Sequence, residues 1–467
     1  MSGDYVSTTN PCRMCRPLGA CLAFRGVENS MVLLHGSQGC STYMRRYISS
    51  HFNEPVDIAS SSLSEKSAVY GGAANLKEGI RNVVEKYDPA VLGVATTCLT
   101  ETIGDNVGAI ITELLTEQPD LARVNIIPVS TPSYTGDHTD GFLDSCRAIL
   151  ATATAGRERS TAARGVKTGA FIAGSTGVIN LFPGILSPAD VRHLGEIMDD
   201  FQTPSIIMPD YSRTLDGGIG EVFQRIPAGG TGIERLAESP ESAFSIEFSL
   251  TSPAGQSCAG FLGDVYDVKG ERLAIPIGIR NSDSFFRALA DMTLQEIPSK
   301  YQEERSRLLD AMVDAHKYLF GRKVAIFGDP ELVLALASFA ADVGLAPVVC
   351  ASGGGNEEFV RRLEQITAAS AQVDSKTVIL KQSDFEEIGR HAEAAGVELL
   401  IGSSKGNHLS RRLGIPLLRV GFPIHDRFGG LRILLVGYRG SLSLLDILTN
   451  IVIKTYEDRP GYGYSYI

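Results

Sequence analysis

The sequence lacks the features that would place the protein in a membrane or on nucleic acid. It has no apolar run of roughly 18 residues, and its first residues, Met1-Ser-Gly-Asp-Tyr5, are polar, so neither a membrane-spanning helix nor a secretory signal is expected. Its formal net charge is −11, which is the wrong sign for binding a phosphate backbone. We therefore expect a cytoplasmic protein with no membrane and no nucleic-acid partner.

A phosphate-binding loop is missing as well. The most glycine-rich candidate, Ala351-Ser-Gly-Gly-Gly-Asn356, lacks the Gly-Lys-Ser/Thr that completes a Walker A loop, and the segment is predicted to be a flexible surface turn after a strand. Any ATP hydrolysis coupled to this protein is therefore expected to take place on another chain.

The pattern that is present is an alternation of short apolar strands and amphipathic helices. The 467 residues are 43% hydrophobic, enough for about two to four domains, each with its own core. A long charged helix is predicted over 299–317. The expected strands cover 91–95, 125–129, 168–173, 206–208, 245–248, 323–328, 347–350, 377–380, 399–401 and 417–420.

These elements predict an α/β protein of three doubly wound, Rossmann-like domains with mostly parallel sheets. The predicted domains are 1–165, 166–318 and 319–467, with the second ending in the long helix. Ligands of such sheets bind beyond the carboxyl ends of the strands. Cys98 and Ser133 are both expected there, because each follows a predicted strand.

Three of the eight cysteines stand in short glycine- or threonine-rich segments: Cys15, Cys40 and Cys98. In a reducing compartment cysteines are more often thiols or metal ligands than disulfides. The three are too far apart in sequence for a local zinc knuckle, but they suit loops that converge at the ends of different strands. Converging thiolates are a common way to hold an iron–sulfur cluster. The alternative for any single cysteine is that it packs as a small apolar side chain.

Several ordered motifs resemble the β-type subunit of nitrogenase component 1. They lie along nearly the whole chain: Asn10-Pro-x3-Cys15-x-Pro-Leu-Gly-Ala20, His35-Gly-Ser-Gln-Gly-Cys40, Phe52-Asn-Glu-Pro-Val56, Ala68-Val-Tyr-Gly-Gly72, Thr96-Thr-Cys98-x-x-Glu101-x-Ile-Gly-Asp105, Thr131-Pro-Ser133, Lys323-x-Ala325-x-x-Gly328-Asp-Pro330 and Val420-Gly-Phe-Pro423.

The resemblance implies that Cys15, Cys40 and Cys98 ligate one half of a P-type [8Fe-8S] cluster. An α-type partner subunit would supply three more thiolates, and Ser133 would bind one iron when the cluster is oxidised; its alternative role is hydrogen bonding in the turn. Two αβ pairs would form an α2β2 complex. An ATP-dependent iron protein would dock near Tyr70, where an exposed aromatic side chain could anchor it. The alternative is that Tyr70 is a half-buried residue of the fold.

A second metal site is implied by the same resemblance. Glu54, Asp310 and Asp314 match carboxylates that hold a mononuclear metal between two β-type subunits, and oxygen ligands suit calcium or ferrous iron. Asp310 and Asp314 are four residues apart and would share one helix face. The alternative is an acidic face of a charged helix.

The other cysteines are predicted not to bind the cluster. Cys12 and Cys21 match no ligand position of the family, and Cys146 and Cys350 fit the core of a helix and a strand. The α-type subunit holds its cofactor with a mid-chain cysteine and a late histidine. Cys258 and His425 do not fit that spacing, which favours a β-type chain.

Three function classes stay open at this stage. The first is a catalytic reductase, either nitrogenase itself or a nitrogenase-like methylthio-alkane reductase that cleaves C–S bonds. The second is a scaffold that matures the nitrogenase cofactor, and the third is a structural subunit without redox chemistry. All three cysteines are retained, which favours a reductase, but 209–217 and 437–441 resemble the scaffold chain at least as well. The mixture slightly favours the methylthio-alkane reductase.

Overall fold

The computed structural model describes residues 12–157, 177–219, 224–368 and 377–457. The described residues form two compact units. One contains Met14–Phe248 and Ser252–Arg272 with two parallel sheets, and the other contains the residues from Leu273 onward, Ser249–Thr251 and Cys12 with a third parallel sheet. No helix in the described ranges is long and apolar enough to cross a membrane.

Two strands of the first sheet are followed directly by the segments that contain Cys40 and Cys98. Its strand order is β2-β1-β3-β4, and every pairing is parallel. Its strands are β1 (Ser30–His35), β2 (Ala59–Ser60), β3 (Val91–Thr96) and β4 (Asn125–Val129). Its helices are α1 (Arg16–Arg25), α2 (Gln38–Phe52), α3 (Glu65–Tyr70), α4 (Ala73–Tyr87), α5 (Cys98–Ile103), α6 (Val107–Glu117) and α7 (His138–Ala153).

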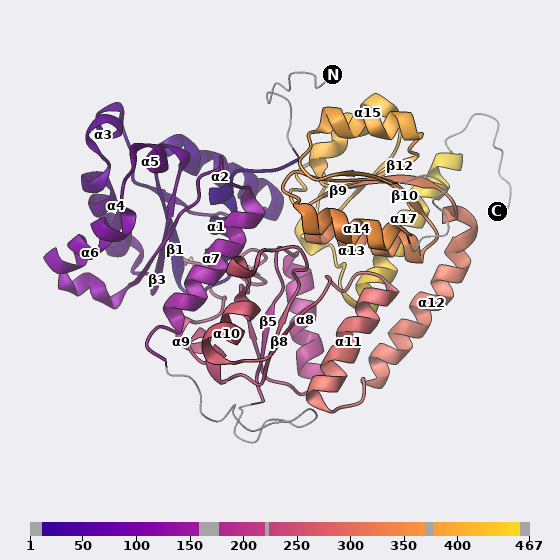
Figure 1. Ribbon diagram of the computed structural model, residues 1–467, viewed down its shortest axis with the longest axis horizontal. Coiled ribbons are helices and arrows are strands. Elements are labelled where there is room, and N and C mark those ends of the chain that lie inside the picture. Colours follow the sequence, from indigo (N-terminus) through magenta and orange to yellow (C-terminus); the bar gives the residue numbers. More distant parts are fainter. Residues whose placement is uncertain (1–11, 158–176, 220–223, 369–376, 458–467) are drawn as a thin grey trace. The chain divides into compact units, whose positions relative to one another are not determined.

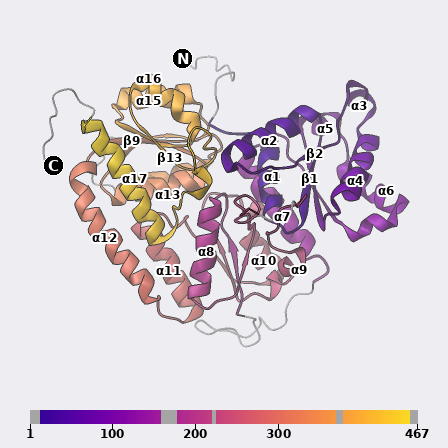
Figure 2. The same ribbon diagram turned by 180° about the vertical axis from the view of Figure 1, so that it is seen from behind.

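Helices cover both faces of this sheet, with α1 and α7 on one face and α4 and α6 on the other (Figures 1 and 2). The strands are apolar along their length because both faces are covered. Leu33, Leu92 and Val94 form a buried cluster with side chains of α4 and α6. The loops that follow the strands begin at the carboxyl ends of the sheet.

The second sheet has the order β6-β5-β7-β8 and is also parallel. Its strands are β5 (Ile179–Phe182), β6 (Ser205–Ile207), β7 (Phe244–Glu247) and β8 (Gly270–Arg272). Its helices are α8 (Pro188–Asp200), α9 (Ile233–Leu236) and α10 (Cys258–Tyr266). The strand expected at 168–173 lies outside the described residues.

The third sheet has the order β11-β10-β9-β12-β13, with all pairings parallel. Its strands are β9 (Lys323–Gly328), β10 (Ala346–Ser352), β11 (Val378–Leu380), β12 (Leu399–Gly402) and β13 (Leu417–Arg419). The helices of this unit are α11 (Ile279–Thr293), α12 (Ser299–Leu319), α13 (Pro330–Asp342), α14 (Glu357–Ala368), α15 (Phe385–Ala395), α16 (Asn407–Leu413) and α17 (Gly437–Glu457).

The predicted fold class is confirmed, because the structure contains three parallel sheets of alternating strands and helices. The predicted boundaries 1–165, 166–318 and 319–467 stay a prediction. One local expectation was wrong, that of a flexible surface turn over 351–356. The glycines Gly353 and Gly355 are buried and therefore do not form a surface turn.

Candidate functional site

Three of the predicted site residues follow neighbouring strands at one edge of the first sheet. Cys40 lies in the first turn of α2 after β1, Cys98 begins α5 after β3, and Ser133 lies in the loop after β4. The registers pair His35 with Thr96 and Ala95 with Val129, so the three strands end side by side. The expected positions of Cys98 and Ser133 beyond strand ends are confirmed.

Cys15 reaches the same region by helix packing. It is the residue before the first turn of α1, and α1 lies directly on α7. Glycine is required on both helices, because a Cβ on Gly19 would lie 1.8 Å from the His138 carbonyl oxygen and one on Gly141 would lie 2.0 Å from that of Arg16. This close crossing places Cys15 at the start of α7, shortly after the Ser133 loop.

Hydrogen bonds of Ser133 join the Cys98 and Cys15 loops. The backbone N–H of Ser133 donates to Cys98 Sγ at an N···S distance of 3.2 Å. The Ser133 Oγ accepts a hydrogen bond of 3.1 Å from the backbone N–H of Arg16, the residue after Cys15. A single serine therefore contacts one candidate ligand directly and the neighbour of another.

Cys40 lies in the first turn of α2, and this helix contacts α1. The hydroxyl of Ser37 donates to Cys40 Sγ at 3.8 Å. Burial raises the pKa of Tyr43, which lies on the same helix, and its hydrogen bond with Tyr47 raises it further. Cys15 directly precedes α1, so the two cysteines lie at the starts of helices that contact each other.

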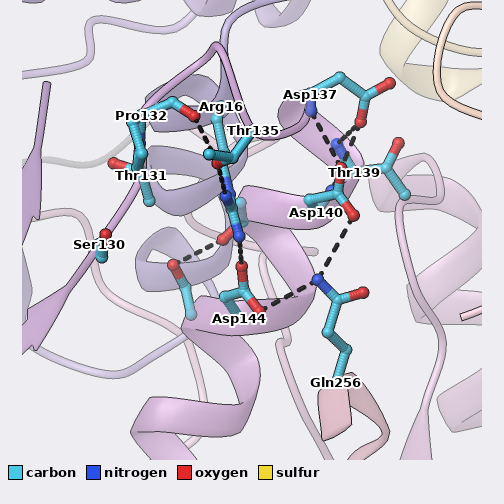
Figure 3. Close-up of polar contacts among 12 residues, drawn as sticks. Arg16, Ser130, Thr131, Pro132, Thr135, Asp137, Thr139, Asp140, Asp144 and Gln256 are labelled. Atoms are coloured by element: carbon cyan, nitrogen blue, oxygen red, sulfur yellow. Dashed lines mark hydrogen bonds and ion pairs between the residues drawn. The ribbon is translucent and has the colours of Figure 1, made fainter. Parts of the chain in front are cut away.

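The side chain of Arg16 braces the Ser133 loop against α7 (Figure 3). Its guanidinium forms an ion pair with Asp144 and donates to the Thr135 hydroxyl. The Gln256 amide donates to Asp144 at 3.1 Å and to Asp140 at 3.3 Å. Sequence reasoning missed Arg16, since its position within the Cys15 motif gave no sign of this pairing.

Burial separates the eight cysteines into two classes. Cys21, Cys146, Cys258 and Cys350 are buried, and burial raises the pKa of each thiol, to about 12 for Cys21 and Cys350. A thiol with a raised pKa is a poor source of the thiolate that iron requires. Cys98 is exposed, and Cys15 and Cys40 are partly exposed.

Cys12 is also partly exposed, but it belongs to the other compact unit. Its side chain packs against the buried cluster of the third sheet, and its backbone N–H donates to the Ser383 carbonyl at 3.3 Å. A carbon placed on Gly353 would lie 2.3 Å from the Cys12 carbonyl oxygen, so this segment is closely packed. These contacts give Cys12 a packing role.

Sequence reasoning also gave no role to His35, which lies at the end of β1. Its Nε2 is 3.1 Å from Asp105 Oδ2, and its Nδ1 is 2.9 Å from Ser61 Oγ. The sequence signals were its place at the start of the His35-Gly-Ser-Gln-Gly-Cys40 motif and after the apolar run Met31-Val-Leu-Leu34, and neither indicated its partners. Burial lowers the pKa of His35 and outweighs the opposing effect of the neighbouring Asp105 carboxylate.

Tyr70 is exposed at the end of α3. Its exposed fraction is 82%, and that of the adjacent Val69 is 76%. The half-buried alternative for this tyrosine is therefore wrong. Gly71 follows with a φ of +92°, a conformation that favours glycine, and Gly72 then turns the chain back into the fold.

The three carboxylates of the second predicted metal site are divided between the two compact units. Asp310 and Asp314 are exposed on α12, while Glu54 follows α2 in the other unit. Burial and then the neighbouring Asp216 raise the pKa of Glu54. In the described ranges no three His, Cys, Asp or Glu side chains gather closely enough to hold one metal ion.

Cys258 and His425 differ in their exposure to solvent. Cys258 is buried at the start of α10, whereas His425 is exposed in the loop after β13. The adjacent Asp426 accepts hydrogen bonds from Arg419 at 2.7–3.0 Å. This arrangement agrees with a polar turn.

Comparison with known proteins gives consistent matches over the whole chain. The family described as nitrogenase component 1 type oxidoreductase matches residues 15–453. The chain is 34% identical to the nitrogenase molybdenum-iron protein beta chain of Clostridium pasteurianum, with 96% of this chain and 94% of the relative covered. It is 33% identical to the nitrogenase vanadium-iron protein beta chain of Trichormus variabilis, with 97% and 96% covered.

A solved structure of nitrogenase Cp1 at pH 6.5 superposes with a TM-score of 0.90 at 31% identity. The superposition covers 100% of this chain and 98% of the chain in that structure. The likeness therefore extends to all three sheets and to the loops that carry the candidate site.

Proposed function

The chain belongs to the nitrogenase component 1 family of oxidoreductases as a β-type subunit, and we propose that it holds half of an interfacial P-type [8Fe-8S] cluster in a nitrogenase-like reductase. The observation that carries this proposal is the grouping of the Cys15, Cys40, Cys98 and Ser133 loops at one edge of the first sheet.

The residues at this edge of the sheet fit an iron–sulfur cluster. Each of the three cysteines is at least partly exposed, whereas the four with raised thiol pKa values are buried elsewhere. Cys15 and Cys40 lie at the starts of α1 and α2, where the helix dipole favours the negative charge of a thiolate. The exposure of Cys98 leaves room for thiolates from an α-type partner.

Each side chain then has a defined task. Cys15, Cys40 and Cys98 supply thiolates, the Ser133 N–H donates to the Cys98 sulfur, and the Ser133 hydroxyl is available as an additional ligand on oxidation. When bound, the cluster supplies one-electron storage and transfer. Tyr70 provides an exposed aromatic contact for the ATP-dependent iron protein that delivers the electrons.

The reaction itself would take place on an iron–sulfur cofactor in the α-type partner, within a cytoplasmic α2β2 complex. We slightly favour reductive C–S cleavage of methylthio-alkanes, because all three cysteines are present while 209–217 and 437–441 depart toward the scaffold pattern. Molybdenum-iron and vanadium-iron relatives are equally similar, so the identities favour neither heterometal.

Two alternatives use the same residues. In nitrogenase itself the substrate would be dinitrogen, and in an assembly scaffold the complex would mature the cofactor without turning over substrate. We further infer that Glu54, Asp310 and Asp314 bind a mononuclear iron or calcium ion where two β-type chains meet. The exposure of Asp310 and Asp314 leaves them available to a second copy.

Methane release from dimethyl sulfide tests the proposal. The complex is purified anaerobically with its α-type partner and assayed with its iron protein, ATP and a reductant, and a reaction without ATP is the control. ATP-dependent methane supports C–S cleavage. A complex with full interface iron but no methane would point to nitrogenase or the scaffold, and ammonia formation from dinitrogen would distinguish those two.

A further inference from the structure

Three loops of the first sheet meet at one buried histidine, His35. Its exposed fraction is 0%, and both ring nitrogens have partners. The Asp105 carboxylate, which contacts Nε2, also accepts the backbone N–H of Gly72 at 3.0 and 3.2 Å. Gly72 is two residues from the exposed Tyr70, so this side of the ring is connected to the predicted docking loop.

The other side of the ring is connected to the loop that leads to Cys40. Ser61 Oγ, which contacts Nδ1, accepts the backbone N–H of Gly36 at 3.0 Å. Nε2 faces a carboxylate, which accepts hydrogen bonds, so Nε2 carries a proton; in the neutral ring Nδ1 then accepts from the Ser61 hydroxyl. Every member of the chain from Gly72 to Gly36 therefore has a matching donor and acceptor.

The main chain of His35 holds the third loop. Its carbonyl oxygen accepts the backbone N–H and the hydroxyl of Thr97, each at 3.1 Å, and the hydroxyl of Thr100 at 3.0 Å. Thr97 directly precedes Cys98. One residue thus contacts the docking loop with its side chain and the Cys98 loop with its backbone.

The backbones of Gly72 and Gly36 pack closely against their neighbours. A Cβ on Gly72 would lie 2.6 Å from Asp105 Oδ2 and 2.8 Å from His35 Cε1. A Cβ on Gly36 would lie 2.3 Å from the Thr97 hydroxyl. Close-packed interiors transmit displacements, so a shift of Gly72 toward His35 would displace Asp105, His35 or both.

We propose that His35 is a positioning residue that transmits docking at Tyr70 to the Cys40 and Cys98 loops. The inference rests on the proposed function, because it requires a docking partner and cysteine ligands. It adds a physical connection between the two sites through the Gly72–Asp105–His35–Ser61–Gly36 hydrogen bonds. The coupling needs no proton transfer, only that these bonds stay intact when the docking loop moves.

The test compares His35→Gln and Asp105→Asn with wild type and with the control His193→Gln. His193 is also buried and also contacts a carboxylate, since its Nδ1 is 3.0 Å from Glu196, but it lies on α8 beside the second sheet. Each complex is measured for iron content, for its electron paramagnetic resonance spectrum and for hydrogen–deuterium exchange of segment 36–40. Exchange is recorded with and without the iron protein and a non-hydrolysable ATP analogue.

In wild type and in His193→Gln, the iron protein should change exchange in segment 36–40. In His35→Gln and Asp105→Asn the iron and the spectrum should be retained, while this response is lost. Iron-protein-dependent electron transfer should then slow about tenfold, which corresponds to about 1.4 kcal/mol in the activation free energy.

Two results would overturn the coupling. If both variants kept the wild-type exchange response in segment 36–40 and the wild-type rate of electron transfer, His35 would transmit nothing. Loss of iron in both variants would show that His35 only supports the fold. Failure of the proposed function looks different, because then the wild-type complex itself would lack interface iron and any response to the iron protein.

Discussion

The backbone amide of Ser133 donates to the sulfur of Cys98 across 3.2 Å, although the two residues come from loops after different strands. An N–H aimed at a sulfur stabilises the negative charge of a thiolate. The same serine accepts a hydrogen bond from the Arg16 backbone, so the contact also fixes where the Cys98 loop lies relative to α1.

Replacing Cys98 should remove the interface iron. In Cys98→Ala the fold should stay soluble, because the side chain is exposed, but iron content should fall and substrate reduction should be abolished. Iron analysis and the activity assay check this. Cys12→Ala is the matched control and should be nearly silent; iron loss there, or full activity in Cys98→Ala, would contradict the ligand assignment.

Removing the ring of Tyr70 should weaken docking of the iron protein. An aromatic contact at the centre of an interface often contributes more than about 1 kcal/mol, which corresponds to a rise of roughly fivefold or more in the iron-protein concentration needed for half-maximal rate. Tyr70→Phe keeps the ring and should behave like wild type. Equal titration curves for Tyr70→Ala and wild type would remove Tyr70 from the docking surface.

A methyl group at Gly72 should be costly. In Gly72→Ala the added carbon would meet Asp105, Leu63 and His35 at 2.6–2.8 Å, and overpacking of this kind costs about 1–3 kcal/mol in unfolding free energy. Gly108→Ala is the control, since that glycine is exposed in α6 and the nearest heavy atom would be 3.7 Å away. Because Gly108 lies in the first turn of α6, the control should change the unfolding free energy by less than about 1 kcal/mol. Urea unfolding of both variants measures the difference, and equal stabilities would contradict the packing argument.

Asp426 should stabilise the fold in a pH-dependent manner. Burial alone would raise its pKa, but hydrogen bonds from Arg419 and Ser404 and the charges of Arg419 and Arg427 outweigh this and lower the pKa to about 2. The folded pKa lies below the ordinary value of 3.8, so the contribution is complete above about pH 4 and is lost as the pH falls toward 2.

Unfolding free energies of wild type and Asp426→Asn, measured between pH 6 and pH 3, check this expectation. The difference should be about 1 kcal/mol at the higher pH, because solvent screens a partly exposed pair, and it should shrink toward acid. Arg419→Met should remove the same pH dependence. A difference that grows as the pH falls would show that the sign is wrong.

The strands that sequence reasoning found and those it missed differ in composition. The apolar runs at Val91 and at Lys323 predicted β3 and β9 because both are buried on two faces. The strand β8, Gly270–Arg272, was missed because its residues are polar and mostly exposed, and only its pairing with β7 defines it. Ser30–His35 was missed although it is buried along its whole length.

For the site, the sequence supplied the candidate ligands but not their supports. Cys15, Cys40 and Cys98 could be selected from their settings and from the family resemblance. The ion pair of Arg16 with Asp144 joins residues far apart in the chain, and no periodicity reports such a contact. The role of His35 depends likewise on Asp105 and Ser61 arriving from two other loops.

The crossing of α1 and α7 at Gly19 and Gly141 has a consequence for engineering. A designer who wished to transplant the cysteine loops to another scaffold could not take Cys15 with α1 alone. Helix α1 keeps its position only because it packs against a glycine on α7. The smallest portable module is therefore the continuous stretch from Met14 to Ala153, and shorter grafts would lose the alignment of the first loop with the other two.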